Sequence, residues 1–131
     1  LPEKKILQVG IRSGTKEEFK FMSQKKQLVK FLPGGNAQEF KKALLPYSNS
    51  PIYLTIDLDW FDPSLLPGTG TPEPGGFFWN DFEVILETLK DFRIVASDIV
   101  ELSPEIDNSG VSSIVAAKVL RSLIMSVQNM Q

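Results

Sequence analysis

The sequence predicts an α/β protein with the three-layer α/β/α fold, in which helices cover both faces of a mainly parallel sheet. Two observations lead to this fold class. Strand-like and helix-like stretches alternate along the 131 residues. The strand-like stretches are nearly continuous apolar runs, which is typical of parallel strands buried on both faces. The composition, with 42% hydrophobic and 23% charged residues, is that of an ordinary globular domain.

The first half of the chain predicts two strands and two helices. In order these are a strand over 5–12, a helix over 15–22, a strand over 29–32 and a helix over 36–45. The strands are rich in apolar and β-branched side chains. Thr15 and Asn36 stand where a side-chain oxygen can cap each helix, and Pro46 is expected to end the second one.

The second half predicts the centre of the sheet. In order we expect a strand over 52–58, a long loop over 62–80, a helix over 81–92, a strand over 93–100 and a closing amphipathic helix over 109–127. The strand 52–58 (IYLTIDL) is the strongest prediction, because it is almost entirely apolar until its acidic end. The loop after it is rich in Gly and Pro, which favour tight turns over regular structure.

Charge and composition exclude several classes of partner. The net charge is −2, with 14 basic and 16 acidic residues, and no basic stripe predicts binding to nucleic acid or to a membrane surface. The longest apolar stretch near the C-terminus is interrupted by Lys118 and Arg121, so no membrane span is predicted and a cytoplasmic location is expected. There is no Cys and no His, so any chemistry that needs a thiol or an imidazole must obtain it from elsewhere.

The acidic end of the strand 52–58 is the most informative part of the chain. Asp57 and Asp59 are two residues apart, and strand alternation would send both side chains to the same face. Two carboxylates in an apolar setting repel each other and call for a cation, and their oxygens suit Mg²⁺ or Mn²⁺. In open parallel sheets, ligands bind beyond the carboxyl ends of the strands, where this pair lies.

The D-x-D spacing alone leaves other interpretations open. The pair could be an acidic strand end that simply turns into solvent. The same spacing occurs in phosphatases of the haloacid type, but these expect Thr two residues after the second Asp, where Phe61 stands. It also occurs in sugar-nucleotide transferases, which would use Asp57 and Asp59 on one divalent ion.

The residues that follow narrow the choice. Residues 57–63 read D-L-D-W-F-D-P, and residues 67–76 read P-G-T-G-T-P-E-P-G-G. This pattern resembles the signature of the ureohydrolase family, the arginases and agmatinases, and its Gly-Thr-Pro-Glu-Pro-Gly-Gly spelling is closer to agmatinases. The resemblance extends from the strand end at residues 9–13 to the closing helix. Two positions depart from the family pattern: Thr55 replaces the usual Ser, and Trp60 is larger than the residue common there.

The resemblance implies a set of site residues. Asp57, Asp59 and Glu101 are expected to be catalytic: Asp57 and Asp59 as manganese ligands, and Glu101 by pairing with the substrate guanidinium. The Thr71 hydroxyl is placed where it could bind the substrate or support Glu101, and it could also simply stabilise the loop. The family completes its pair of Mn²⁺ ions with His and Asp ligands from a Gly-Gly-Asp-His segment and an Asp-Ala-His-x-Asp segment, and neither segment occurs in this sequence. Asp62 is expected to form a turn.

The resemblance also implies an activity. We expect residues 1–131 to be the C-terminal part of a single ureohydrolase domain, an incomplete arginase-like fold without its N-terminal part. The intact enzyme would hydrolyse a guanidino compound, with agmatine as the first candidate, to urea and an amine, and would form a homotrimer or homohexamer. Arginine, guanidinobutyrate and formiminoglutamate are the other candidate substrates within the family.

Two further hypotheses come from other functional classes. The chain could be a non-catalytic module for folding or oligomer contacts, because half of the metal ligands are missing from it. It could also be a sugar-nucleotide transferase, although the P-G-T-G-T-P-E-P-G-G loop argues against that class. If the chain is part of a ureohydrolase, the isolated chain is expected to be inactive.

Overall fold

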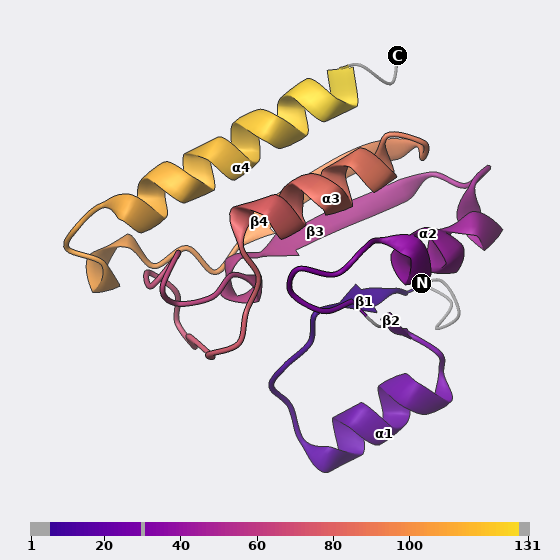
Figure 1. Cartoon of the computed structure of the whole chain (residues 1–131), viewed down its shortest axis with the longest axis horizontal. Helices are drawn as coiled ribbons and strands as arrows, with labels where there is room; N and C mark the ends of the chain where they lie inside the picture. The colour runs from indigo at the N-terminus through magenta and orange to yellow at the C-terminus, as the bar shows by residue number, and fades with distance from the viewer. Residues whose placement is uncertain (1–5, 30, 129–131) are drawn as a thin grey trace.

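The computed structural model of the chain describes residues 6–29 and 31–128. The elements, in chain order, are β1 (Gln8–Val9), α1 (Lys16–Gln24), β2 (Leu28–Val29), α2 (Gln38–Leu44), η2 (Leu45–Tyr47), β3 (Ile52–Asp57), η3 (Leu58–Trp60), α3 (Trp79–Leu89), β4 (Ile94–Val100), η4 (Pro104–Ile106) and α4 (Val111–Gln128), where η denotes a short 3₁₀ helix (Figure 1). Lys5 and Lys30, which the sequence places in the first two strands, lie outside the described residues.

All described strand pairing is parallel, as the sequence predicts. β1 pairs with β2, and β3 pairs with β4 in a register that joins Asp57 to Val100 at the carboxyl ends of the two strands. The alternation of helices with parallel strands confirms the α/β class. The strands form two sheets of two strands each where one sheet was expected.

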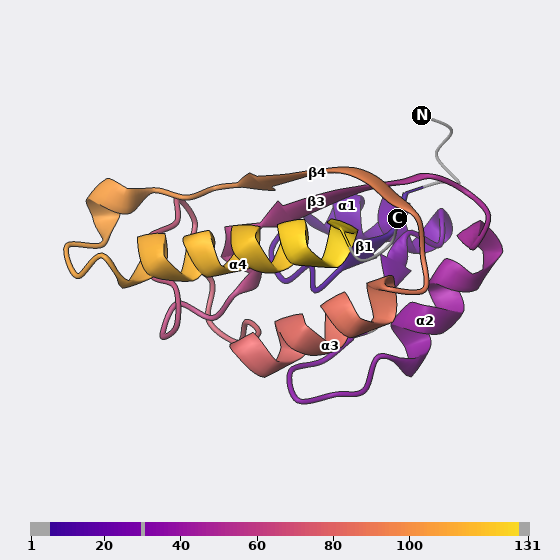
Figure 2. The ribbon, with the colours of Figure 1, turned by 90° about the horizontal axis from the view of Figure 1, so that it is seen from above.

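Helices cover one face of the β3–β4 sheet. α3 and α4 both lie on the same side of it (Figure 2). Leu54 and Ile56 of β3 point toward that side and pack against the core. The neighbouring Tyr53 points the other way and is 60% exposed. Within the described residues, the chain therefore supplies two of the three expected layers around β3 and β4.

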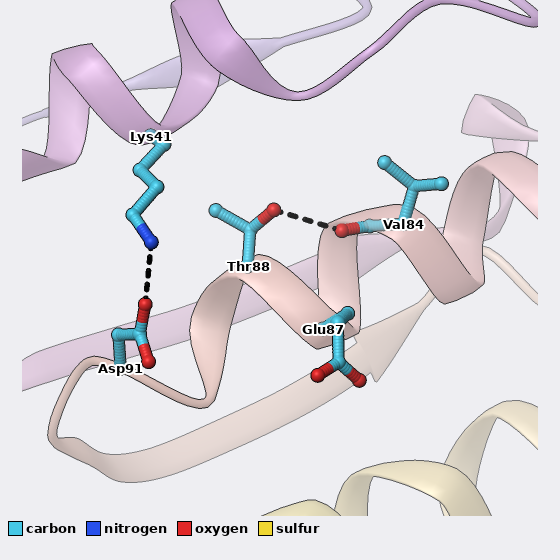
Figure 3. A pocket seen from close by; sticks show the side chains of 5 residues that line it. All are labelled: Lys41, Val84, Glu87, Thr88 and Asp91. Atoms are coloured by element: carbon cyan, nitrogen blue, oxygen red, sulfur yellow. Dashed lines mark hydrogen bonds and ion pairs between the residues drawn. The ribbon is translucent and has the colours of Figure 1, made fainter.

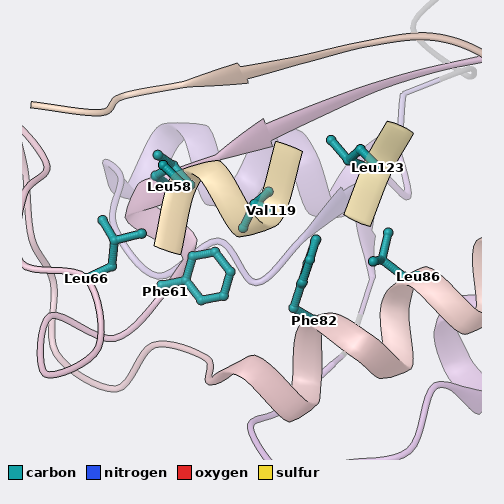
Figure 4. Close-up of a cluster of buried hydrophobic side chains, with 8 residues drawn as sticks. Leu58, Phe61, Leu66, Phe82, Leu86, Val119 and Leu123 are labelled. Carbon is teal, nitrogen blue, oxygen red and sulfur yellow. The ribbon is translucent and has the colours of Figure 1, made fainter. Parts of the chain in front are cut away.

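Two clusters of apolar side chains form the core. The first fills the space between the end of β3, the long loop, α3 and α4 (Figure 4), and comprises Leu58, Phe61, Leu66, Phe82, Leu86, Ala116, Val119 and Leu123. The second joins β2, α2 and the start of β4, and comprises Val29, Phe40, Leu44, Leu89, Phe92 and Ile94. Because α3 contributes to both clusters, it holds the two sheets in one hydrophobic body.

The helix boundaries follow from local hydrogen bonds. Thr15 caps α1 as predicted: its hydroxyl accepts from Glu18 N (3.2 Å), and the Glu18 carboxylate accepts from Thr15 N (2.7 Å). α2 starts one residue later than predicted, with Ala37 as its cap, although Asn36 still accepts a bond from Gln38 N (3.1 Å).

Two other predicted helix boundaries differ from the structure by one or two residues. α2 ends at Leu44, one residue before the predicted end, and the chain continues through Pro46 in η2, because a proline fits the first turn of a helix. α3 begins at Trp79, before the predicted start at Asp81. Asp81 lies in its first turn, where its carboxylate accepts from Phe78 N (2.8 Å) and so caps the helix. No helix of the described part is long and apolar enough to cross a membrane.

Candidate functional site

The two predicted aspartates meet at the carboxyl end of β3. Asp57 is the last residue of the strand and caps the short helix η3, its Oδ1 accepting a bond from Asp59 N (2.9 Å). The expectation that strand alternation brings the pair together was wrong, because the strand ends at Asp57. The chain turns there as Leu58 enters the core with 0% exposure. The cap, and not the pleat of the strand, makes the carboxylates neighbours.

Among the described residues, the carboxylates of Asp57 and Asp59 have few hydrogen-bond partners. Asp59 Oδ2 accepts from the hydroxyl of Thr71 (2.5 Å), while Asp59 Oδ1 is buried and has no protein partner. Partial removal from water raises the pKa of Asp57, and the negative charge of Asp59 raises it further. The Asp59 N–H and the guanidinium of Arg12 oppose that rise in pKa. A pair of this kind is stabilised by added positive charge.

The base of the long loop is tied together by Asp62. Its carboxylate accepts from the backbone and hydroxyl of Ser64 and from the backbone N–H groups of Gly75 (3.0 Å) and Gly76 (3.1 Å). These bonds, with those to Ser64 the stronger cause, lower the pKa of Asp62 to about 2. Gly76 has no room for a side chain, since an added Cβ would lie 2.5 Å from Asp62 N. The prediction that Asp62 forms a turn is confirmed.

The middle of the loop is fixed to the start of α4. Gly68 N donates to the hydroxyl of Ser112 (2.8 Å), which is fully buried. Asp107 holds that end of α4 by accepting from Ser109 and from Ser112 N (2.7 Å), and these bonds lower the pKa of Asp107 below its ordinary value. The loop that carries Thr71 is therefore anchored on both sides.

Glu101 lies one residue beyond the end of β4 in a strained backbone conformation. Its φ is +67°, in the left-handed region that residues other than Gly rarely adopt. The next residue, Leu102, pairs with Thr69 of the long loop. A Cβ built on Gly70 would lie 3.4 Å from Glu101 Oε2, which places the Glu101 carboxylate against the loop just before Thr71. Strain of this kind is concentrated at functional sites.

Sequence reasoning missed one residue of the site, Arg12. Its guanidinium donates to the backbone carbonyls of Asp59 (2.7 Å), Trp60 (2.9 Å) and Glu73 (2.8 Å). Arg12 comes shortly after β1, and it bonds to Asp59 just after β3, so the segments that follow the carboxyl ends of these two strands meet at the site. The rule that ligand sites gather at these ends could have drawn attention to it.

Trp60 follows Asp59 in η3, and Asp98 of β4 lies opposite Thr55 of β3. The Trp60 indole stacks on Phe77 with ring centroids 4.1 Å apart, so its bulk fills the space beneath the loop. Asp98 accepts a bond from the Tyr53 hydroxyl, next to the Thr55 side chain, on the face of the sheet that α3 and α4 leave open. The Thr55 and Tyr53 hydroxyls lower the pKa of Asp98, and the bond to Asp98 raises the pKa of Tyr53.

A surface hollow elsewhere on the molecule is unrelated to this site. It lies between α2 and α3 and is lined by Lys41, Val84, Glu87, Thr88 and Asp91 (Figure 3). Its main feature is an exposed ion pair between Lys41 and Asp91, with a 2.6 Å separation. Exposed pairs of this kind contribute little.

The sequence profile of the arginase family matches residues 1–126. The chain belongs to the arginase family. It is 40% identical over 118 residues to an agmatinase of Pyrococcus horikoshii, covering 88% of this chain and 41% of that protein. It is 32% identical over 123 residues to an agmatinase of Bacillus cereus, covering 92% of this chain and 41% of that protein.

Solved structures agree with this family assignment. A Clostridium difficile protein described as a candidate agmatinase is 48% identical and superposes with a TM-score of 0.82, covering 94% of this chain and 45% of that one. The arginase of Bacillus caldovelox is 26% identical with a TM-score of 0.79, covering 92% and 43%. The likeness confirms the predicted fold class. The chain spans less than half the length of these arginase-family proteins.

The acidic residues that the structure describes in this arginase-family chain do not form a complete metal cluster alone. Among the described residues, no group of three or more His, Asp or Glu side chains is close enough to hold a metal ion. Asp57 and Asp59 form a pair, while Glu101 faces Gly70 of the loop. The donor set gathered here is thus two carboxylates at the end of β3, with a third carboxylate on the neighbouring strand end.

Proposed function

We propose that this chain contributes the Asp57 and Asp59 ligands and the Glu101 substrate contact to an agmatinase-like ureohydrolase. Residues 1–131 would be the C-terminal part of its single domain, and the intact enzyme would hydrolyse a guanidino compound to urea and an amine. The observation that carries the proposal is the carboxylate pair at the end of β3. One of its oxygens, Asp59 Oδ1, is buried and has no protein partner.

The chemistry of this pair fits a hard divalent cation. A buried carboxylate oxygen without a hydrogen bond is costly, and a cation would satisfy it. The family resemblance makes that cation manganese, bound as a pair and completed by His and Asp ligands outside this sequence. Such cations supply Lewis acidity and an acidified water at neutral pH. Within this chain, Thr71 donates to Asp59 Oδ2 and so leaves the other oxygen for a cation.

Glu101 is suited to the organic part of the substrate. A carboxylate accepts two parallel hydrogen bonds from a planar guanidinium, and the charges assist each bond. The backbone of Glu101 is left-handed, and its carboxylate lies close to Gly70 of the long loop. Glu101 would hold and orient the guanidinium while Asp57 and Asp59 hold the cations.

Agmatine is the substrate favoured for the intact enzyme. The relatives of Pyrococcus horikoshii and Bacillus cereus are both named agmatinases, and the Gly-Thr-Pro-Glu-Pro-Gly-Gly spelling points the same way. Another relative, 34% identical over 91 residues, is a proclavaminate amidinohydrolase, so a larger guanidino compound is the competing choice. A homo-oligomer, as the family resemblance implies, and a cytoplasmic location belong to the same proposal.

One observation favours a second candidate function, a non-catalytic module for folding or oligomer contacts. The face of the β3–β4 sheet that carries Tyr53, Thr55 and Asp98 is left open by α3 and α4. Parallel strands are normally covered on both sides. The enzymatic proposal is preferred because the chain belongs to the arginase family and carries two aspartates at the carboxyl end of β3.

Complementation tests the proposal. The purified chain should release no urea from agmatine with Mn²⁺ present. Co-expression with the part of the Pyrococcus horikoshii agmatinase that precedes the matched region should restore urea release, and Asp57→Asn should abolish it. Release from arginine but not agmatine would correct the substrate. A stable complex that remains inactive with all the guanidino substrates named above would favour the non-catalytic module.

A further inference from the structure

Arg12 connects three backbone positions that are far apart in sequence. Its Nη2 donates to the carbonyls of Asp59 (2.7 Å) and Glu73 (2.8 Å), and its Nη1 donates to that of Trp60 (2.9 Å). These partners lie 47, 61 and 48 residues away along the chain. One side chain thus ties the turn after β3 to the far arm of the long loop. Only a planar guanidinium offers several donors fixed in one fork.

The three carbonyls belong to the parts of the chain that arrange Asp59. The carbonyl of Asp59 itself is held by Arg12, and its carboxylate is held by Thr71, which lies two residues before Glu73 in the same arm of the loop. Arg12 therefore fixes the main chain of Asp59 relative to the segment that orients its side chain. Without Arg12, these two segments would be joined by fewer bonds, chiefly those of Thr71 to Asp59 and of Gly75 and Gly76 to Asp62.

The packing of Gly10 against two aromatic rings fixes the position of the backbone that leads to Arg12. Gly10 has a φ of +77°, and a Cβ there would overlap the Trp60 indole and lie 2.5 Å from Phe77 Cε2. The connection between β1 and α1 therefore runs directly against the stacked rings of Trp60 and Phe77. From this backbone position, the Arg12 guanidinium reaches the carbonyls of Asp59 and Trp60.

The charge of Arg12 and its geometry would act in opposite directions on a cation. The positive charge lies close to the aspartates, with Arg12 Nη2 2.7 Å from the Asp59 carbonyl oxygen. Charge alone would therefore repel a divalent ion and weaken its binding. Geometry would strengthen binding, by keeping both aspartates in place before the ion arrives. Variants that separate charge from geometry can thus identify which one governs.

We infer that Arg12 is a positioning residue, which holds Asp59 and the loop arm around Thr71 in the arrangement that receives the cation. The inference rests on the proposed function, since it assumes that Asp57 and Asp59 bind a divalent ion. Arg12 contacts backbone carbonyls, so it acts on the ligands and not on the substrate.

Two substitutions in the full 131-residue chain separate the effects. Arg12→Lys keeps the charge and loses the fork, whereas Arg12→Gln loses both. Arg93, an exposed residue just before β4 at the opposite end of the sheet, provides matched controls as Arg93→Lys and Arg93→Gln. Mn²⁺ affinity is measured from the electron paramagnetic resonance signal of free Mn²⁺. Loop order is measured in the metal-free protein from the ¹⁵N relaxation of the Gly70, Thr71, Gly75 and Gly76 amides.

Positioning predicts that both Arg12 variants bind Mn²⁺ about 10-fold more weakly, as for other groups that orient ligands. The loop amides should become more mobile, while both Arg93 variants behave as wild type. Arg12→Lys with wild-type affinity, or Arg12→Gln with higher affinity, would show a charge effect only and overturn the inference. If wild type binds no Mn²⁺, the metal proposal fails, and the metal-free relaxation data alone decide whether Arg12 orders the loop.

Discussion

Thr71 donates its hydroxyl to Asp59 Oδ2 at 2.5 Å across twelve residues of sequence, and the other oxygen of the same carboxylate stays buried without a protein partner. The relationship gives the two oxygens of Asp59 different roles. One is committed to the loop, which fixes the plane of the carboxylate. The other is left for a positive ligand that the described residues do not provide.

The first prediction separates the aspartates from Glu101. Asp57→Asn and Asp59→Asn should each weaken Mn²⁺ binding at least about 10-fold, because a neutral amide is a poorer ligand than a carboxylate. Glu101→Gln should leave Mn²⁺ binding within about 2-fold of wild type, since Glu101 is assigned to the guanidinium. In the complemented enzyme, Glu101→Gln should lower kcat/KM roughly 30-fold or more, the effect of losing a charge-assisted pair worth about 2 kcal/mol. Loss of manganese from the Glu101 variant would refute these roles.

The second prediction concerns the hydroxyl of Thr71. Thr71→Val keeps the shape of the side chain and removes the donor, so Asp59 can rotate and should bind Mn²⁺ about 10-fold more weakly. Thr71→Ser keeps the donor and should restore most of the affinity. Electron paramagnetic resonance of free Mn²⁺ measures both. Equal affinity for Thr71→Val and wild type would mean that the hydrogen bond only stabilises the loop.

The third prediction tests the close approach at Gly10. Gly10→Ala should lower the free energy of unfolding by about 2–4 kcal/mol, because the new Cβ overlaps the Trp60 indole and the backbone has a positive φ. Gly34→Ala is the matched control: its φ is +71°, and its Cβ would meet nothing within 4 Å. The control should cost only about 1 kcal/mol from the backbone. Urea denaturation measures both, and equal losses would contradict the proposed contact.

The fourth prediction concerns the pH dependence that Asp62 brings to stability. Its pKa falls from an ordinary value of 3.8 to about 2 in the folded chain. A lowered folded-state pKa stabilises the fold above the unfolded pKa, and this contribution is lost as pH falls from about 4 through about 2. Asp62→Asn should therefore lose less stability than wild type over that pH range.

A graded control for Asp62 comes from its donors. Ser64→Ala removes the Ser64 hydroxyl, which donates to the carboxylate at 2.6 Å. The pKa of Asp62 in this variant should move part of the way back toward 3.8. Urea unfolding series between pH 5 and pH 2 measure the stability effect, and NMR titration of the carboxyl carbon measures the pKa. An unchanged pKa in Ser64→Ala would show that other donors hold the carboxylate.

The sequence alone determined the α/β class, the parallel strands, the carboxylate pair and the turn at Asp62. These features depend on local patterns: apolar runs that suit buried strands, the cap at Thr15, and a loop whose glycines reach φ values that other residues avoid and whose prolines fix φ. The family signature around residues 57–76 is equally local. The bounds of β3 and β4 lie within one residue of the prediction, whereas the structure describes the predicted strands 5–12 and 29–32 only as Gln8–Val9 and Leu28–Val29.

Only the tertiary structure decided how the pair is brought together and what surrounds it. The sequence suggested strand alternation, but burial of Leu58 ends β3 at Asp57 and a capped turn takes over. The bonds of Arg12 to Asp59 and Glu73 join positions 47 and 61 residues away from it. The strained backbone of Glu101 likewise lies next to a long-range bridge between Leu102 and Thr69. Such contacts depend on the packing of whole elements, which no short window of sequence encodes.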